Sequence, residues 1–181
     1  MLMLASCLIQ APLLSAIEEN TAMLEKIFQY EINNRAFAYQ SISSLKEEMK
    51  NSEQAAFWRA YFELETLNKP LYEKMAAEYE LTPDKLLVGV KTFVTNIAFA
   101  LFPKKMMSIM TDATIEYVEK LKQLPRLSKE EHKEFFTYVV LQENAQANAL
   151  LHAREGEYDL AAELLENFVQ KHIKLNKSAF E

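Results

Sequence analysis

Five side chains that can bind a metal or donate and accept hydrogen bonds interrupt the apolar faces of predicted helices. They are Glu31, the pair Glu65 and Asn68, and the pair Glu143 and Gln146. At 3.6 residues per turn, the members of each pair lie one turn apart on the same face. A buried carboxylate is costly unless a cation, a proton or strong donors compensate it. The sequence therefore predicts a metal site or a polar cluster inside a helical core.

Three interpretations of these residues remain open. In the first, the core is metal-free: Arg35, on the edge of the apolar face one turn after Glu31, pairs with a carboxylate, and amides and tyrosines donate to the others. In the second, the carboxylates bind a metal ion. In the third, the helix phases differ slightly and the carboxylates lie at a solvated edge. The tyrosines expected to donate their hydroxyls are Tyr61, Tyr72, Tyr79 and Tyr117.

Long amphipathic helices must position these side chains. The periodicity predicts helices over about 16–50, 53–80, 82–123 and 129–155, with a bend near Pro103 and a shorter helix over about 157–176 after Gly156. Only two glycines occur in 181 residues. We predict an all-α fold: an antiparallel four-helix bundle with a short N-terminal packing segment and a fifth, C-terminal helix. The chain is expected to be one domain, 1–181, whose bundle core covers about 16–155.

The third predicted helix carries a strongly apolar face, which the periodicity places toward the core. This face consists of Leu86, Val90, Phe93, Ile97 and Leu101. Three further aromatic residues are expected to be exposed: Phe99, Phe102 and Phe180. Segment 147–168 also resembles one tetratricopeptide helix pair, but no second copy follows it.

Composition excludes some classes of function. A net charge of −6 disfavours nucleic-acid binding, which requires a basic surface. A single cysteine, Cys7, fits a reducing compartment, so a cytoplasmic location is expected. No apolar run reaches the length of a transmembrane helix. The apolar N-terminus is expected to pack, with a membrane or export role as the alternative.

The inward carboxylates resemble the di-iron pattern of the ferritin-like superfamily. That pattern has a Glu on helices one and three and Glu-x-x-His on helices two and four. Glu31 matches the first ligand, and the pairs Glu65/Asn68 and Glu143/Gln146 match the two Glu-x-x-His motifs with an amide at each histidine position. The resemblance covers about 16–155 and implies a four-helix bundle. Amides are weak iron ligands, and no inward carboxylate is evident on the third helix.

The resemblance and the missing ligands together lead to a functional expectation. The chain is expected to be a non-catalytic bundle without a cofactor that acts through a partner protein, a small apolar ligand or self-association, for example as a homodimer. The alternative is an iron- or manganese-dependent oxidase or hydroxylase in which Glu31, Glu65 and Glu143 hold the metal, so enzyme activity is left open. A third hypothesis is lipid association through the N-terminus and segment 93–102.

Overall fold

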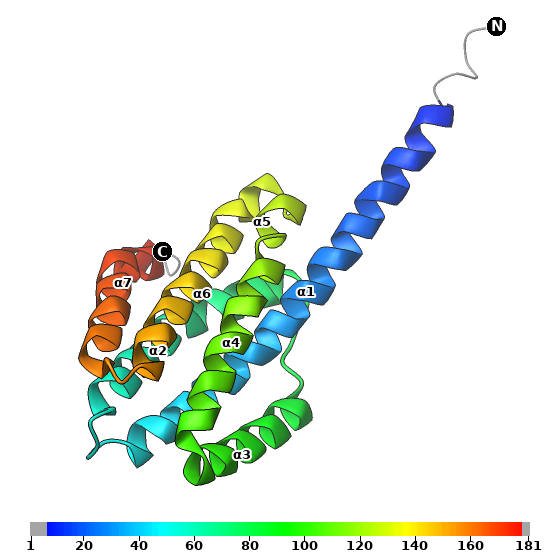
Figure 1. The fold of residues 1–181 in the computed structure, drawn as a ribbon. Coiled ribbons are helices and arrows are strands. Elements are labelled where there is room, and N and C mark those ends of the chain that lie inside the picture. Colours follow the sequence, from blue (N-terminus) through cyan, green and yellow to red (C-terminus); the bar gives the residue numbers. More distant parts are fainter. Residues whose placement is uncertain (1–6, 179–181) are drawn as a thin grey trace, which may run out of the picture.

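The described part of the chain folds entirely into helices (Figure 1). The computed structural model describes residues 7–178 and contains no strand in that range. The predicted all-α class is therefore confirmed. In chain order, the elements are α1 (Cys7–Glu48), α2 (Ala55–Glu78), α3 (Lys85–Leu101), α4 (Pro103–Leu121), α5 (Leu124–Leu127), the short 3₁₀ helix η1 (Glu130–His132), α6 (Lys133–Arg154) and α7 (Tyr158–Ser178).

Helix α1 begins earlier than predicted. Residues 7–15, expected to form a separate packing segment, continue the helix, so that prediction is wrong for them; residues 1–6 lie outside the described range. From position 13 to position 48 the sequence contains neither glycine nor proline, the residues that most often end a helix, and Pro12 lies in the second turn of α1. The first turns of α1 extend beyond the other helices in Figure 1.

The third predicted helix is two helices. α3 ends at Leu101, and Phe102, with φ −139° and ψ 59°, leaves the helical conformation. Pro103 then begins α4, where its missing N–H costs no helical hydrogen bond. The predicted bend is thus at the expected position but is a complete break, which allows α3 to run in its own direction across α1 and α4 (Figure 1).

The helices pack in a closed order around the interior. α2 packs against α1 and α7, α6 packs against α7 and α4, and α3 packs against both α1 and α4. Helix α7 belongs to the main hydrophobic core, so the core extends past residue 155, its predicted end. The buried residues of α7 in this core are Ala161, Ala162, Leu165 and Val169.

A conservative truncation measures how far α7 contributes to the core. Val169→Ala removes buried methyl groups and is expected to lower the free energy of unfolding by about 1.5 kcal/mol. Urea unfolding followed by circular dichroism measures this change. The exposed neighbour Gln170 is the matched control, and Gln170→Ala is expected to change stability by less than about 0.5 kcal/mol. Equal effects of the two substitutions would show that α7 is not part of the core.

The apolar face of α3 points to solvent, opposite to the prediction. Leu86, Val90, Phe93, Ile97 and Leu101 are all exposed, by between 46% and 78%. Val88 and Phe99 are the buried residues of α3 instead, so the expected exposure of Phe99 is also wrong, whereas Phe102 is exposed as expected. Phe180 lies outside the described range. Periodicity finds the apolar face of a helix, but it does not say what that face meets.

Candidate functional site

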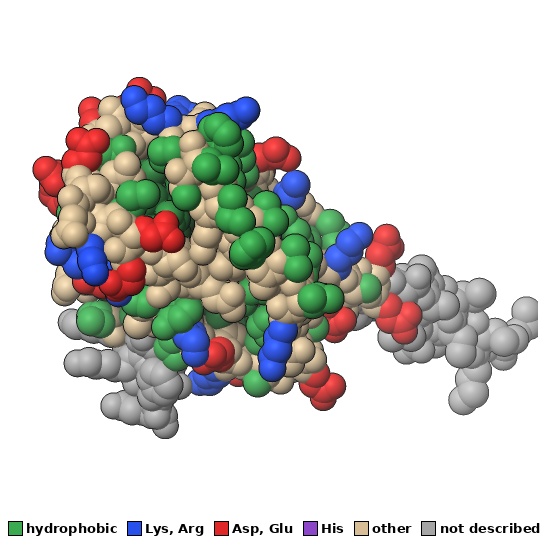
Figure 2. Space-filling view, turned by 90° about the horizontal axis from the view of Figure 1, so that it is seen from below, with side chains coloured by type: hydrophobic (Ala, Val, Ile, Leu, Met, Phe, Trp, Pro, Cys, Tyr) green, Lys and Arg blue, Asp and Glu red, His purple; other side chains and the backbone are tan. Residues whose placement is uncertain are grey.

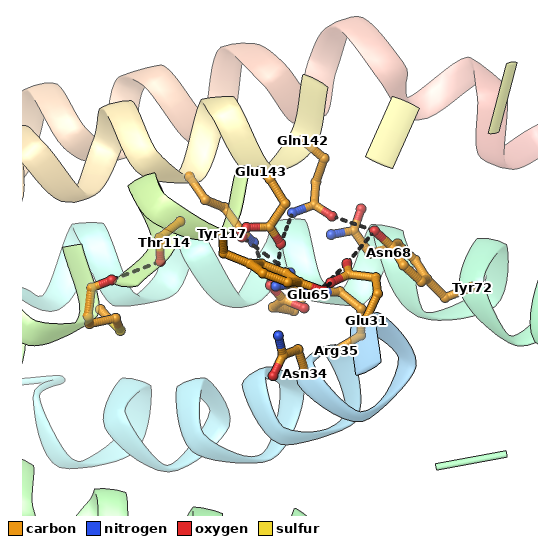
Figure 3. A network of polar contacts seen from close by, with 12 residues as sticks. Glu31, Asn34, Arg35, Glu65, Asn68, Tyr72, Thr114, Tyr117, Gln142 and Glu143 are labelled. Atoms are coloured by element: carbon orange, nitrogen blue, oxygen red, sulfur yellow. Dashed lines mark hydrogen bonds and ion pairs between the residues drawn. The ribbon is translucent and has the colours of Figure 1, made fainter. Parts of the chain in front are cut away.

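The guanidinium of Arg35 lies among three carboxylates that come from three helices. Its Nε is 3.1 Å from Glu31 Oε1 on α1 and its Nη1 is 2.8 Å from Glu65 Oε1 on α2. Its Nη2 is 2.5 Å from Glu143 Oε1 on α6. Figure 3 shows these side chains converging between the helices. All three glutamates are at most 1% exposed, so the ion pairs lie in the interior.

Two tyrosines complete the surroundings of Glu31. The hydroxyl of Tyr72 on α2 donates to Oε1 at 2.8 Å, and that of Tyr117 on α4 donates to Oε2 at 2.9 Å (Figure 3). Both were predicted donors. Tyr79, also predicted, instead places its hydroxyl 2.9 Å from Nδ1 of His132. The α4 contribution to this site is thus a phenol and not a carboxylate.

The amide side chains of α6 bind the other two glutamates. Gln146 donates through Nε2 to Glu65 Oε1 at 2.6 Å and accepts from Arg35 Nη1 at 3.2 Å. Gln142 donates through Nε2 to Glu143 Oε1 at 3.2 Å. Each of these carboxylates therefore has both a cationic and a neutral donor, which lowers the cost of burying it.

Asn68 lies on the other side of the cluster, beside a small cavity. Its Oδ1 accepts from the hydroxyl of Tyr138 at 2.7 Å, whereas its buried Nδ2 has no hydrogen-bond partner among the described residues. Together with Arg35, Glu65 and Tyr72, it lines a cavity of about 180 Å³ between α1 and α2.

Burial sets the protonation of this cluster. It raises the pKa of Glu31 to about 8 and that of Glu65 to about 7, although the charge of Arg35 opposes both shifts and Glu143 adds to both. Burial lowers the pKa of Arg35, but the carboxylates of Glu143, Glu65 and Glu31 outweigh it and hold the pKa well above its usual value. Arg35 is thus a permanent cation, and two of its partners, Glu31 and Glu65, bind protons near neutral pH.

These residues do not fit a di-iron centre. The space between the three carboxylates contains the Arg35 guanidinium, whose charge would repel a metal cation. The acidic residues of α4, namely Asp112, Glu116 and Glu119, are exposed. Among residues 7–178, no group of three histidine, cysteine or acidic side chains is arranged to hold a metal ion.

A larger pocket, of about 410 Å³, lies between α1, α3 and α4 and reaches Arg35 and Glu143 at its inner end. The Oγ of Ser41, which is 2% exposed, has no hydrogen-bond partner among the described residues. Lys91 lines the α3 side and donates to Asn34 Oδ1 at 3.0 Å. The apolar side chains of the lining include Phe37, Ile42, Leu45, Phe99, Met106, Ile109 and Met110.

The structure brings together all six residues singled out in the sequence: Glu31, Arg35, Glu65, Asn68, Glu143 and Gln146. It adds two that sequence reasoning missed, Gln142 and Tyr138. Both lie on α6, where Tyr138, Gln142 and Gln146 follow one another at four-residue intervals. This spacing places the three residues on one face of α6, with Glu143 beside it. The spacing alone could therefore have identified Gln142 and Tyr138 from the sequence.

Comparisons with known proteins give no family for this chain. A scan against protein-family models and searches of curated proteins and of solved structures found no significant match. The ferritin-like resemblance therefore stays a prediction. Within residues 7–178, no helix combines the length and hydropathy needed to cross a bilayer.

Proposed function

We propose that this chain is a non-catalytic helical protein of ferritin-like ancestry and bundle arrangement, and that it acts by binding a small, neutral and largely apolar ligand. The single observation that supports loss of the metal centre is the position of Arg35. Its guanidinium lies 2.5–3.1 Å from an oxygen of each of the three glutamates that match metal ligands. A fixed cation there supplies the compensating charge that metal ions would otherwise supply.

The pocket between α1, α3 and α4 supports ligand binding as the remaining activity. Its volume of about 410 Å³ falls within the range of small-molecule sites, and its lining is mainly apolar. At its inner end, each nitrogen of Arg35 lies within 3.1 Å of a carboxylate oxygen, although Nε has no hydrogen-bond partner among the described residues. The nearby carboxylates offset the charge of Arg35 and would repel a ligand anion. Ser41 lines the pocket, and its buried Oγ has no hydrogen-bond partner among the described residues, so we infer that a side-chain rotation would let it bind a neutral hydroxyl or carbonyl group.

The absence of a catalytic metal is tested directly by elemental analysis. We expect the full chain, produced in medium supplemented with iron and manganese, to contain neither metal in stoichiometric amount and to remain fully helical. Two equivalents of metal that disappear in a Glu65→Ala variant would contradict the proposal and support the oxidase alternative.

Ligand binding has a built-in reporter in Trp58, the single tryptophan of the sequence. Its ring packs edge-on against Phe99, a pocket residue, with 5.7 Å between the ring centroids. We expect 1-decanol to change the Trp58 fluorescence saturably. Ala38→Phe, which fills the pocket, should weaken this binding at least about tenfold because overfilling a packed space displaces the ligand.

Two further variants separate pocket binding from other effects. Ser41→Ala should weaken decanol binding about fivefold through loss of one hydrogen bond. Ala77→Phe, at an exposed position of α2 outside the pocket lining, is the matched control and should bind decanol normally. A saturable signal that is unchanged in Ala38→Phe would show that this pocket is not the site.

A further inference from the structure

The outward face of α3 presents a continuous apolar surface. Leu86, Phe93 and Leu101 are 78%, 68% and 65% exposed, and they are spaced along the whole helix. Between them lie the exposed Val90, Val94 and Ile97. Figure 2 shows hydrophobic side chains gathered in a band across this side of the molecule. A surface of this kind on a water-soluble domain marks an interaction site.

The charges along this segment all have one sign. From position 85 to position 111 the sequence contains no aspartate or glutamate, although the whole chain has a net charge of −6. The same segment contains the exposed residues Lys85, Lys104 and Lys105, and also Lys91, which lies on the pocket side of α3. The carboxylate of Asp84, just before it, accepts from the backbone N–H groups of Leu86 and Leu87 and so caps the helix. The apolar face is therefore flanked by cations at both ends.

This charge pattern argues against a second copy of the chain on the α3 face. Antiparallel pairing of two α3 helices would place Lys85 of one copy near Lys104 and Lys105 of the other, and parallel pairing would place like residues together. In both arrangements, lysines of the two copies would lie close together beside the apolar contact, and their repulsion is unfavourable. The face instead complements a surface that is apolar inside and anionic at its edge.

We propose that α3 binds the surface of a membrane containing anionic lipids, lying in the plane of the interface. Its apolar face would enter the acyl boundary, while the flanking lysines would contact phosphate and carboxylate headgroups. A helix of 17 residues is about 25 Å long, so Lys85 at one end and Lys104 and Lys105 beyond the other could contact separate headgroups at once. This inference does not depend on a ligand in the pocket, because it uses the opposite face of α3.

Vesicle flotation with the full chain tests this proposal. We expect the protein to float with vesicles of phosphatidylcholine and phosphatidylserine, and to bind vesicles of phosphatidylcholine alone about tenfold more weakly. Added salt should weaken binding to the anionic vesicles because it screens the lysines. The double variant Lys104→Glu/Lys105→Glu should lose the preference for anionic lipid.

A second variant separates the contribution of the α3 face to vesicle binding from that of the apolar N-terminus. Phe93→Gln with Leu101→Gln changes only exposed side chains, so the fold should be retained, as circular dichroism can verify. It should reduce vesicle binding about tenfold. Leu141→Gln, at a 49% exposed leucine of α6, is the matched control and should bind like the unchanged protein.

Three outcomes would overturn the proposal. Failure of the folded, unchanged protein to bind anionic vesicles is the first. Vesicle binding that survives the Phe93→Gln/Leu101→Gln substitutions in full is the second. The third is a dimer, detected by light scattering, that the same double variant converts to monomer, because the α3 face would then be a self-association surface.

Discussion

Replacing Arg35 by methionine is expected to lower the free energy of unfolding by about 3–5 kcal/mol at neutral pH, because it removes the cation shared by three buried acidic side chains, of which Glu31 is mainly protonated at that pH. Methionine keeps an unbranched apolar side chain but lacks the guanidinium. The expected loss of stability would therefore come mainly from the missing charge. The variant is expected to recover part of its stability in mild acid, where Glu31 and Glu65 take up protons. Its deficit should therefore grow as the pH rises.

Urea unfolding at several pH values measures this effect. Arg59, whose nearest acidic contact is Glu166 at 4.0 Å on the surface, is the matched control, and Arg59→Met should change stability by less than about 1 kcal/mol. Adding Glu65→Gln and Glu143→Gln to Arg35→Met should restore much of the loss by removing the unpaired charges. An Arg35→Met protein as stable as Arg59→Met would show that the guanidinium does not hold the three helices together.

Stability is also expected to fall as the pH rises from about 5 to about 8, the reverse of the usual behaviour of salt-bridged carboxylates. The folded-state pKa values of Glu31, about 8, and Glu65, about 7, both exceed the ordinary value of 4.5. Between these limits the folded protein binds more protons than the unfolded chain. Each extra proton makes the free energy of unfolding decrease by about 1.4 kcal/mol per pH unit. The stabilisation from these two protonated carboxyl groups is complete below their ordinary pKa of 4.5. It is lost once the pH exceeds their folded-state pKa values.

The double variant Glu31→Gln/Glu65→Gln provides the comparison for this pH dependence. Glutamine imitates the protonated carboxyl, so the variant should show a much flatter stability profile between about pH 5 and pH 8.5. Subtracting the two profiles removes the contribution of all titratable groups that the two proteins share. A difference profile that is flat, or that rises with pH, would contradict raised pKa values at these two positions.

Interior positions of the site could be predicted because helical periodicity is reliable within a continuous helix. Glu31, Glu65 and Glu143 each lie in the middle of a helix with many apolar neighbours that fix its phase, and the structure places them together. Arg35 was placed only at the edge of the apolar face. Its long side chain reaches inward from there, and which carboxylate it meets depends on helix packing that a single helix cannot reveal.

The surroundings of α3 could not be predicted from local patterns. Pro103 indicated a change of direction, but whether the chain bends or breaks depends on the packing of α3 against α1 and of α4 against α6. The apolar face of α3 has the same periodicity as a core helix, although it faces outward. Likewise, the pattern of α7 predicted a helix, but not the burial of its Leu165 between α2 and α6.

The arrangement around Arg35 also limits how the helices can slide along one another. A shift of α2 by one turn, about 5.4 Å, would replace Glu65 opposite Arg35 with either Lys69 or Tyr61. One direction brings two cations together in the interior, and the other leaves the guanidinium without one of its anions. A comparable shift of α6 would present Val139 or Ala147 in place of Glu143. A single charged side chain thus selects one alignment of three long helices, which apolar contacts alone distinguish poorly.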